Sequence, residues 1–580
     1  MTLLQELESR LAAALTATLG EPTAAAVTVA TDLRFGDYQT NAAMVLAKQR
    51  KTNPRVLAQE IIDQLELNGL ATADIAGPGF INFRILATAY AARISALSRD
   101  PRLGVPATGT GKTVVVDFSA PNVAKPMHVG HIRSTIIGDS LARIARFLGF
   151  KVIADNHIGD WGTQFGMIIY GWNHFLDSTA LAADPISELV RVYRQVNALK
   201  EQPGVLEACK AELVKLQAGD PENLAIWQQC IDVSKCGLQK IYARLDVQFD
   251  HWHGESYYNS RLPGLVEEFL EKGIARESNG AVCIFSAGTK PLEQDPFKVH
   301  KEDGWTDNPA IIRKADGGFL YATTDLATIQ FRIDEWQADH VWYVVGVPQQ
   351  LHFRQLFDAA ARWGKTGDFQ HIEFGSILGD DRKLMKTRSG DNVGLIEVLE
   401  EAVERAAKAI AEKNPDLQGQ EAAQIAEIVG IGAVKFAELS QGRLTDYVFS
   451  WDRMLALQGD TAPYLQYSHV RIRSIFRKLD APFDASSAES HLNAAAEIHL
   501  ARLLVRFGEV LPTILEDFRP NLLANYLLEL ARAFHSYFEA CPVLKAEQTT
   551  RSSRLALCEL TSRTLKQGLY LLGIQVPERM

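Results

Sequence analysis

The segment VVVDFSAPNVAKPMHVGH at residues 114–131 decides the fold of this 580-residue chain. Its three opening valines are typical of a buried strand, and a polar loop then leads to His128-Val-Gly-His131. A helix is predicted next, because apolar residues recur at spacings of four, three and four: Ile137, Leu141, Ile144 and Leu148. We therefore expect the two imidazoles at the N-terminus of a helix that follows a parallel-type strand. Free N–H groups and the helix dipole favour phosphate there, and Gly130 leaves room for a ligand's base or ribose. The segment predicts a nucleotide site.

Two other interpretations of the histidine pair stay open on those four residues alone. The histidines cap a helix in the first, and they share a zinc ion in the second. The zinc interpretation needs further ligands, and the six cysteines contain no Cys-x-x-Cys pair, so we expect no metal held by the protein. The strand–loop–helix context favours nucleotide binding over both.

A neighbouring stretch, TGTGKT at residues 108–113, superficially matches a phosphate-binding P-loop. The P-loop spacing requires glycine where this chain has Pro106, and the loop must follow a strand and open a helix. Because Gly111-Lys112 precedes the predicted strand, we interpret the stretch as a linker between domains.

The composition is that of an ordinary globular protein, with 47% hydrophobic and 22% charged residues. A net charge of −10 argues against a protein that coats nucleic acid nonspecifically, although a local basic face at Arg471, Arg473, Arg477 and Lys478 is compatible with RNA or with a solvated helix. We expect no membrane segment, since no run of about 20 apolar residues occurs. Charged residues in the first predicted helix exclude a secretory signal, and sparse cysteines suit the cytoplasm.

The length and pattern predict three domains, at 1–108, 109–453 and 454–580. The first contains an opening helix at 3–19, a second helix near 55–67 and a strand after the Pro-Gly turn at 77–83. From about residue 395 onward we expect only helices, so the third domain is predicted to be entirely helical.

The second domain alternates strands with helices, which marks an α/β fold with a parallel sheet. Polar helices at about 173–250 interrupt the alternation as an insertion, and a hairpin at Asn279-Gly280 closes it. After the first strand, further strands are expected at 152–154, 309–314, 319–321, 340–345 and 371–374.

Several polar residues fall just after predicted strands: Asn122, His128, Asn156, Asp325, Gln349 and Lys386. In an open parallel sheet these positions converge on one edge, where ligands bind. We therefore treat them as one site.

Over essentially its whole length the chain resembles the class I aminoacyl-tRNA synthetases, and among them the arginyl-tRNA synthetase family. The motifs that carry the resemblance are DFSAPN at 117–122, Lys125, HVGH at 128–131, NHIGDWGTQFG at 156–166, YATTDLA at 321–327 and the terminal GIQVPERM at 573–580. The resemblance implies a Rossmann-type catalytic domain, an N-terminal α+β domain that touches tRNA and an all-α C-terminal anticodon-binding domain.

The resemblance also implies arginine activation: ATP and arginine give arginyl-adenylate and pyrophosphate, and the arginyl group passes to the 3′-terminal ribose of tRNA(Arg). Such catalysis is mostly positioning and electrostatic stabilisation. His128, Gly130 and His131 are expected to bind ATP, while Lys383 and Lys386 meet the pyrophosphate with Mg²⁺. The usual Lys-Met-Ser-Lys-Ser appears here as KLMKT, and Lys125 is expected to assist this irregular loop.

By the same resemblance, Asp325 binds the guanidinium of arginine, which matches a carboxylate with two charge-assisted hydrogen bonds. Tyr321 and Gln349 complete the pocket, Asn122 holds the backbone groups of the substrate, and His131 lies close to them. From its position alone, Asp325 is equally a carboxylate that stabilises a helix start.

Tyr464 and Tyr467 are three residues apart and so share one helix face. We expect their rings to stack on unpaired RNA bases while Arg471 meets phosphate or a base edge. Core packing is the alternative fate of the two tyrosines. The resemblance adds Met580 near the anticodon, and Phe80 and Asn82 as contacts to the outer corner of tRNA, which are equally sheet residues. It also implies that arginine activation needs bound tRNA. We expect a monomer.

Three competing functions remain. A class I synthetase for cysteine requires a zinc–thiolate pocket that scattered cysteines cannot build, and one for glutamine requires no acid at position 325. A synthetase-like RNA-binding protein without catalysis is disfavoured by His128, His131 and Lys386. A small nucleotidylyltransferase leaves the helical C-terminal domain unexplained.

Overall fold

The computed structural model describes residues 1–162, 164–378, 393–448, 450–456 and 459–580. These residues form two units. The first comprises Met1–Thr108, Asn414–Val429 and Ala456–Met580, and the second comprises Gly109–Lys413 and Gly430–Leu455.

A parallel sheet organises the second unit. Its strands are β5 (Thr113–Asp117), β6 (Lys151–Asp155), β12 (His340–Tyr343) and β13 (Asp368–His371), in the order β13-β12-β5-β6. The first three confirm the predicted strands. The strand expected at 371–374 was wrong in position, because the sheet pairing of β13 ends where that prediction began.

Both faces of this sheet are covered. Val115 of β5 pairs in register with Ile153 and Val341, and all three belong to a core shared with helices α11 (Leu262–Glu271), α12 (Tyr321–Asp334) and α13 (Gln350–Trp363). Because strand side chains alternate, Val114 and Val116 face the other way, and both are fully buried. Helix α5 (Gly130–Phe147) packs closely on the β5 end, since a Cβ on Gly138 would lie 2.3 Å from the Cβ of Phe118.

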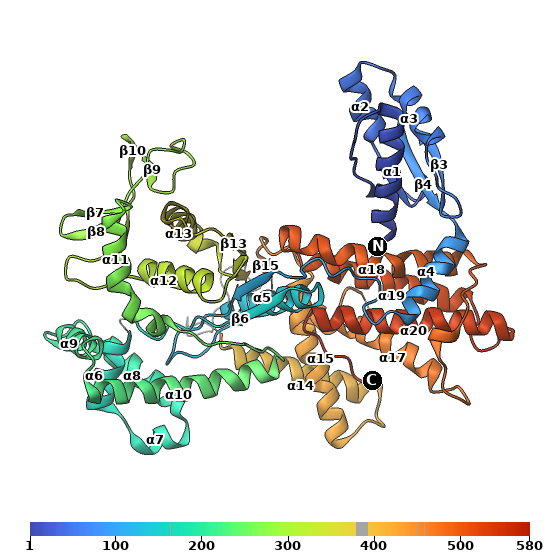
Figure 1. The fold of residues 1–580 in the computed structure, drawn as a ribbon. Helices are drawn as coiled ribbons and strands as arrows, with labels where there is room; N and C mark the ends of the chain where they lie inside the picture. Colours follow the sequence, from blue (N-terminus) through green and yellow to red (C-terminus); the bar gives the residue numbers. More distant parts are fainter. Residues whose placement is uncertain (163, 379–392, 449, 457–458) are drawn as a thin grey trace. The chain divides into compact units, whose positions relative to one another are not determined.

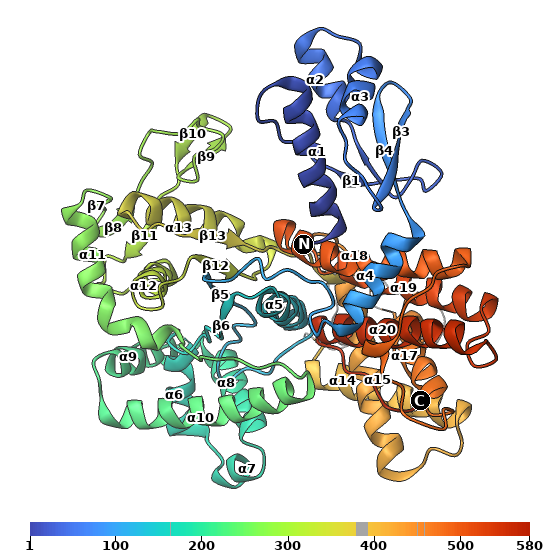
Figure 2. The same ribbon diagram turned by 45° about the vertical axis from the view of Figure 1, so that its right-hand side comes forward.

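The insertion between β6 and β12 begins with a helical cluster, as predicted (Figures 1 and 2). Its helices are α6 (Gln164–Phe175), α7 (Ser178–Ala183), α8 (Pro185–Leu199), α9 (Val205–Gln217) and α10 (Pro221–Arg244), followed by the 3₁₀ segment η1 (Glu255–Arg261). An antiparallel sheet of order β11-β8-β7 then follows, with β7 (Ala275–Ser278), β8 (Ala281–Ile284) and β11 (Ala310–Arg313), and a separate hairpin joins β9 (Lys298–Lys301) to β10 (Gly304–Asp307). The hairpin predicted at Asn279-Gly280 is confirmed, and both residues have positive φ.

Two strand predictions in this unit need correction. Residues 319–321 form no strand: Phe319 makes a single bridge to Arg313, and Tyr321 opens α12 after an extended Leu320. Beyond residue 395, the expectation of helices alone was wrong, because β15 (Tyr447–Val448) pairs with β14 (Ile377–Leu378). The remaining elements of the region are η2 (Val347–Gln349), α14 (Leu395–Lys413), α15 (Gly419–Leu439) and α16 (Trp451–Met454).

The first unit begins with an α+β segment. Its elements are α1 (Leu3–Leu19), β1 (Thr28–Val29), β2 (Tyr38–Thr40), α2 (Ala42–Arg50), α3 (Pro54–Asp63), β3 (Ala71–Ala76), β4 (Phe80–Ile85) and α4 (Ala87–Arg99). The strands form an antiparallel sheet of order β1-β2-β4-β3. Helix α1 starts at a capping box between Thr2 and Gln5, which confirms the predicted opening helix.

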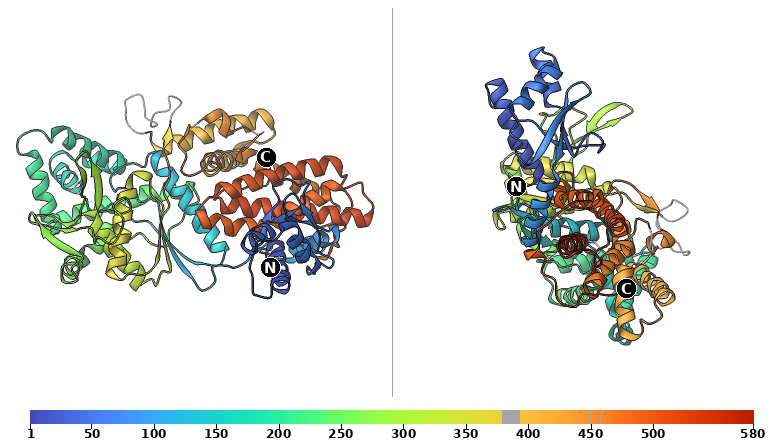
Figure 3. Two further views of the ribbon diagram at one scale, coloured as in Figure 1. Left: turned by 90° about the horizontal axis from the view of Figure 1, so that it is seen from above. Right: turned by 90° about the vertical axis from the view of Figure 1, so that its right-hand side faces the viewer.

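The rest of the first unit is helical. It contains α17 (Ala462–Phe476), η3 (Ala485–Ser487), α18 (Ala495–Asp517), α19 (Asn521–Ala540) and α20 (Gln548–Leu571). Helices α18, α19 and α20 lie side by side (Figure 3), and α4 packs on α18 and α20. Among the described residues, none of the helices is both long and apolar enough to cross a membrane.

Candidate functional site

The loop after β5 is held in an unusual backbone conformation. Ser119, Ala120 and Ala124 all have positive φ, at 73°, 43° and 57°, although none is glycine. Hydrogen bonds hold the loop: the N–H of Ser119 donates to Ser134 Oγ at 2.8 Å, and the N–H of Ala120 donates to Asn156 Oδ1 at 3.2 Å. Strained loops of this kind are typical of functional sites.

Asn156 was grouped with the ligand-facing residues from the sequence, and the structure gives it another place. Its side chain is fully buried, and its Nδ2 donates to the hydroxyl of Tyr242 at 3.2 Å. Asn156 therefore braces the loop that carries Asn122 and does not face a ligand.

The histidine pair lies at the start of α5, as predicted, with the ring centroids of His128 and His131 3.9 Å apart. The N–H of Gly130 donates to Nδ1 of His128, and the N–H of His128 donates to Nδ1 of His131, both at 3.1 Å. Because each Nδ1 accepts a hydrogen bond, the neutral rings carry their proton on Nε2. Burial lowers the pKa of His128; burial, reinforced by the neighbouring His128, lowers the pKa of His131 to about 4. Both imidazoles are neutral Nε2–H donors near pH 7.

Two details of the helix start differ from expectation. The first amides of α5 are already engaged, because the N–H of His131 donates to the carbonyl of His128 and that of Ile132 to Val129. The imidazoles, rather than free amides, are thus the donors that this helix start offers. A Cβ on Gly130 would lie 2.9 Å from the ring of His128, so the glycine first makes room for that imidazole.

A cavity of about 440 Å³ opens beside the histidine pair. It brings together Asn122, Lys125, His128 and His131, as the sequence predicted. The ammonium of Lys125 lies 5.2 Å from the ring centre of Tyr193, and both side chains line the cavity. The remaining lining residues are Pro121, Ala124, Pro126, Met127, Val190, Arg194 and Gly394. Cations, imidazole donors and an amide make this cavity suitable for phosphate oxygens.

Asp325 lies in the first part of α12, between two histidines from other elements. Its Oδ2 is 2.6 Å from Nε2 of His352 in α13, and its Oδ1 is 3.9 Å from Nε2 of His157, which follows β6. The side chain of Asp325 is 20% exposed. A partly exposed carboxylate whose neighbours orient it is suited to binding a cation.

A buried ion-pair network supports this carboxylate from the same helix. The guanidinium of Arg332 in α12 donates from Nη2 to Asp117 Oδ2 and to Asp155 Oδ2, both at 2.7 Å. Arg332 and Asp155 are fully buried, and Asp117 is nearly so. The network ties α12 to the carboxyl ends of β5 and β6, which fixes where Asp325 lies.

The sequence missed three residues that surround Asp325. His352 was not singled out, and His157 and Glu255 were not assigned a role. Burial raises the pKa of Glu255, while His157 lowers it and Asp325 raises it further, so the three groups interact electrostatically. Sequence signals for these residues are weak: His157 lies inside the NHIGDWGTQFG motif at 156–166, and only the fold brings η1 beside α12.

The other predicted site residues fall in different places. Tyr321 is 58% exposed, and its ring meets His352 edge-on at 4.7 Å, so it belongs to the Asp325 group. Gln349 is exposed at the end of η2. Lys383 and Lys386 lie outside the described residues.

The predicted RNA-binding residues of α17 form a surface group. Tyr467 is 45% exposed, and Tyr464 is partly buried. The guanidinium of Arg471 lies 4.9 Å from the ring centre of Phe538 and 3.2 Å from Nδ1 of His535. Neither tyrosine ring is therefore fully buried in the core.

The C-terminal tail that carries Met580 is anchored to the same helix. The buried Gln466 of α17 donates to the carbonyl of Gln575 at 2.8 Å, and Arg477 donates to the carbonyl of Glu578 at 3.3 Å. Met580 is partly exposed.

The two residues of the N-terminal sheet that were predicted to contact tRNA differ in their exposure. Phe80 is partly exposed at the start of β4. Asn82 is 1% exposed in β4, which pairs with β2 and β3, and this burial favours the sheet-residue alternative over a contact with RNA.

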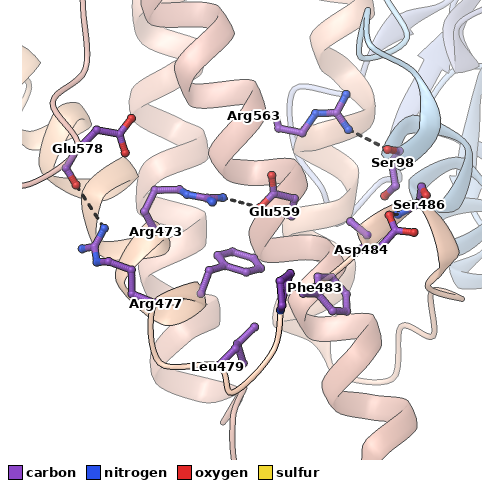
Figure 4. A pocket seen from close by; sticks show the side chains of 13 residues that line it. Ser98, Arg473, Arg477, Leu479, Phe483, Asp484, Ser486, Glu559, Arg563 and Glu578 are labelled. Atoms are coloured by element: carbon purple, nitrogen blue, oxygen red, sulfur yellow. Dashed lines mark hydrogen bonds and ion pairs between the residues drawn. The ribbon is translucent and has the colours of Figure 1, made fainter.

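A larger cavity, of about 550 Å³, lies in the first unit among α4, α17 and α20 (Figure 4). Its cations are already engaged: Arg473 pairs with Glu559 at 2.6 Å, and Arg563 donates to the backbone carbonyls of Ser98 and Asp100. Acids and bases are balanced there, so the smaller cavity beside the histidines is the better candidate for an anionic substrate.

Known proteins match the chain along its length. The family described as "tRNA synthetases class I (R), catalytic domain" matches residues 93–451, "Arginyl tRNA synthetase N terminal domain" matches 5–85 and "DALR anticodon binding domain" matches 465–580. An arginine–tRNA ligase of Laribacter hongkongensis is 44% identical over 591 residues, which cover 100% of both chains. One of Synechococcus sp. is 43% identical over 594 residues, covering 100% of this chain and 99% of the relative.

Solved structures agree with the sequence matches. The arginyl-tRNA synthetase of Plasmodium falciparum superposes with a TM-score of 0.84 at 28% identity, covering 100% of this chain and 99% of that one. The arginyl-tRNA synthetase of Thermus thermophilus superposes with a TM-score of 0.80 at 26% identity, covering 100% of both.

Proposed function

The chain belongs to the arginyl-tRNA synthetase family and acts as an arginine–tRNA ligase, and from this premise we propose which of its residues hold each substrate. It activates arginine with ATP, releases pyrophosphate and passes the arginyl group to the 3′-terminal ribose of tRNA. The cavity beside the histidine pair is the observation that carries the assignment of the ATP site.

The ATP phosphates occupy that cavity. The neutral rings of His128 and His131 donate Nε2–H to phosphate oxygens, and Lys125 supplies a positive charge. As the carboxylate of arginine attacks the α-phosphate, charge grows on these oxygens and the same donors stabilise it. Lys386, and with it Lys383, meets the departing pyrophosphate. The described residues that line the cavity include no carboxylate, so Mg²⁺ would be held mainly by the oxygens of the triphosphate and would offset their negative charge.

Arginine is bound between the cavity and Asp325. Asn122 lines the cavity and holds the backbone groups of the amino acid, with His131 nearby. Asp325 meets the guanidinium, and Glu255 adds a second acidic group that interacts with Asp325. Tyr321 and Gln349 close the pocket.

The helical C-terminal domain binds tRNA. Tyr467 and Tyr464 stack on unpaired bases, Arg471 meets phosphate or a base edge, and Met580 closes the surface from the anchored tail. Phe80 extends the contact to the N-terminal domain. The division of labour follows segments 1–108, 109–453 and 454–580, in a cytoplasmic monomer.

One experiment tests the function and its main competitor together. Total tRNA is incubated with each amino acid in turn, with and without ATP. Charging with arginine alone, and only with ATP, supports the proposal. Charging with another amino acid supports a different class I specificity, and no charging supports the RNA-binding protein without catalysis. ATP–pyrophosphate exchange is then measured with and without tRNA, and negligible exchange without tRNA is expected.

A further inference from the structure

His157 has a fixed tautomer that leaves one nitrogen facing Asp325. Its Nδ1 is 2.9 Å from the backbone carbonyl of His253. A carbonyl oxygen only accepts hydrogen bonds, so Nδ1 carries a proton. In the neutral ring, Nε2 therefore presents a lone pair toward Oδ1 of Asp325, 3.9 Å away.

This arrangement is unfavourable unless something positive lies between the two atoms. A lone pair and a carboxylate oxygen face each other with no hydrogen in between, in a site where His157 is only 12% exposed. A proton on Nε2 resolves the conflict by making an imidazolium beside a carboxylate. A guanidinium N–H group resolves it too, because one nitrogen can lie about 2.9 Å from each acceptor.

We propose that arginine binding expels the proton from Nε2 of His157, so that the substrate's guanidinium replaces the imidazolium as the cation beside Asp325. The inference rests on the proposed role of Asp325. In the empty site, Nε2–H of His157 pairs with Asp325. In the loaded site, the guanidinium donates to Oδ1 of Asp325 and to Nε2 of His157, and the proton passes to solvent.

The surrounding charges favour this exchange. The groups that face His157 are Asp117, Asp155, Asp160, Glu255, Asp325, Arg332, Tyr258 and His253. Burial and Arg332 lower the pKa of His157, but Asp117, Asp325 and Asp155 raise it, and the result is a raised pKa. Replacing one cation by another leaves the net charge of this largely buried group unchanged, whereas adding arginine to an imidazolium places two cations on one carboxylate. His352 remains bonded to the other oxygen, Oδ2, in both states.

The proton can be counted on the unmodified chain. Arginine is titrated into the full-length protein by calorimetry at about pH 6, below the ordinary imidazole pKa of about 6.5, in two buffers of different ionisation enthalpy. We expect roughly one proton released per arginine bound, and roughly none at about pH 9. Proton uptake, or no release at about pH 6, overturns the inference.

A variant at position 157 tests whether the released proton comes from His157. His157→Asn keeps a donor to the carbonyl of His253 and removes the titrating nitrogen, so proton release should vanish and the arginine KM should stop depending on pH. In the unmodified chain, that KM should rise about tenfold for each pH unit below the pKa of His157. His174→Asn is the matched control: His174 also bonds a carbonyl through Nδ1, at 2.7 Å from Tyr170, but is exposed on α6. Persistent proton release in His157→Asn overturns the inference.

Asp325→Asn separates this inference from the proposed function. Weakened arginine binding in Asp325→Asn, together with no proton release in the unmodified chain, refutes only the proton exchange. Unchanged arginine binding in Asp325→Asn refutes the arginine site itself, and the exchange with it.

Discussion

Replacing Asp325 with asparagine tests the arginine site with the least structural disturbance. The amide has the shape of the carboxylate and can still accept the hydrogen bond from Nε2 of His352, 2.6 Å away in the parent chain. The buried network of Arg332 with Asp117 and Asp155 does not involve position 325, so α12 should keep its place. What is lost is one negative charge facing the substrate.

The size of the effect follows from the burial of the group. Removing one partner of a hydrogen-bonded charge pair that is largely withdrawn from water costs roughly 2–5 kcal/mol. The side chain of Asp325 is only 20% exposed, which favours this range over the smaller values of surface pairs. Since about 1.4 kcal/mol is a factor of ten, we expect the arginine KM to rise from about 30-fold to several thousand-fold.

The assay is steady-state aminoacylation with arginine varied at saturating ATP and tRNA, followed by the ATP KM and a thermal melt. The ATP KM and the melting temperature should stay close to those of the parent. Asp334→Asn on the same helix is the control, because Asp334 is 45% exposed and pairs with Lys365 at the surface. An arginine KM within about threefold of the parent value, with an intact fold, refutes the assignment of Asp325.

Four further predictions concern other parts of the molecule. Because the folded pKa of His131 is about 4, against about 6.5 in the unfolded chain, the unfolded state binds more protons between these values. The free energy of unfolding should therefore fall by up to about 3 kcal/mol as pH drops through that window, and His131→Gln should lose this part of the pH dependence in denaturant titrations. Gly130→Ala should lower kcat at least about tenfold with a small change in melting temperature, because its Cβ displaces the ring of His128; full activity contradicts this. Arg332→Met should lower the free energy of unfolding by about 3–5 kcal/mol in denaturant titrations, since it leaves two buried carboxylates without their cation, and a loss below about 1 kcal/mol argues against the network. Tyr467→Ala should raise the tRNA KM roughly 5- to 150-fold through lost stacking, with the arginine KM unchanged; an unchanged tRNA KM removes it from the RNA surface.

The elements that the sequence predicted well carry their own periodicity. The valines of β5 and the helical spacing after His131 are local patterns, and both elements appear as expected. Pairing between distant segments leaves no such pattern. The two-residue β15 exists only because β14 lies beside it, and β13 is a half-exposed edge strand whose hydrophobic signal is weak.

The residues of the candidate site differ in the same way: some are close in the sequence, and others are brought together only by the fold. Asn122, Lys125, His128 and His131 lie within ten residues of one another and indeed share a cavity. The neighbours of Asp325 come from the loop after β6, from η1 and from α13, so only the folded chain reveals them. Asn82 shows another limit of the sequence: a polar residue in a strand need not face solvent, and this one is 1% exposed in β4, the strand between β2 and β3.

The order of strands in the parallel sheet also means that one edge of β5 lacks its partner strand during synthesis on the ribosome. Strand β5 meets β6 soon after synthesis, but its other neighbour, β12, arrives much later: the N–H of Thr113 donates to Asp339, 226 residues downstream. At about 5–20 residues per second, the edge of β5, which contains three valines, stays unpaired for roughly 10–45 s. An open apolar strand edge invites pairing with other chains. Successful expression of this protein should therefore depend on chaperones that shield nascent chains during that interval, and slower translation should increase aggregation.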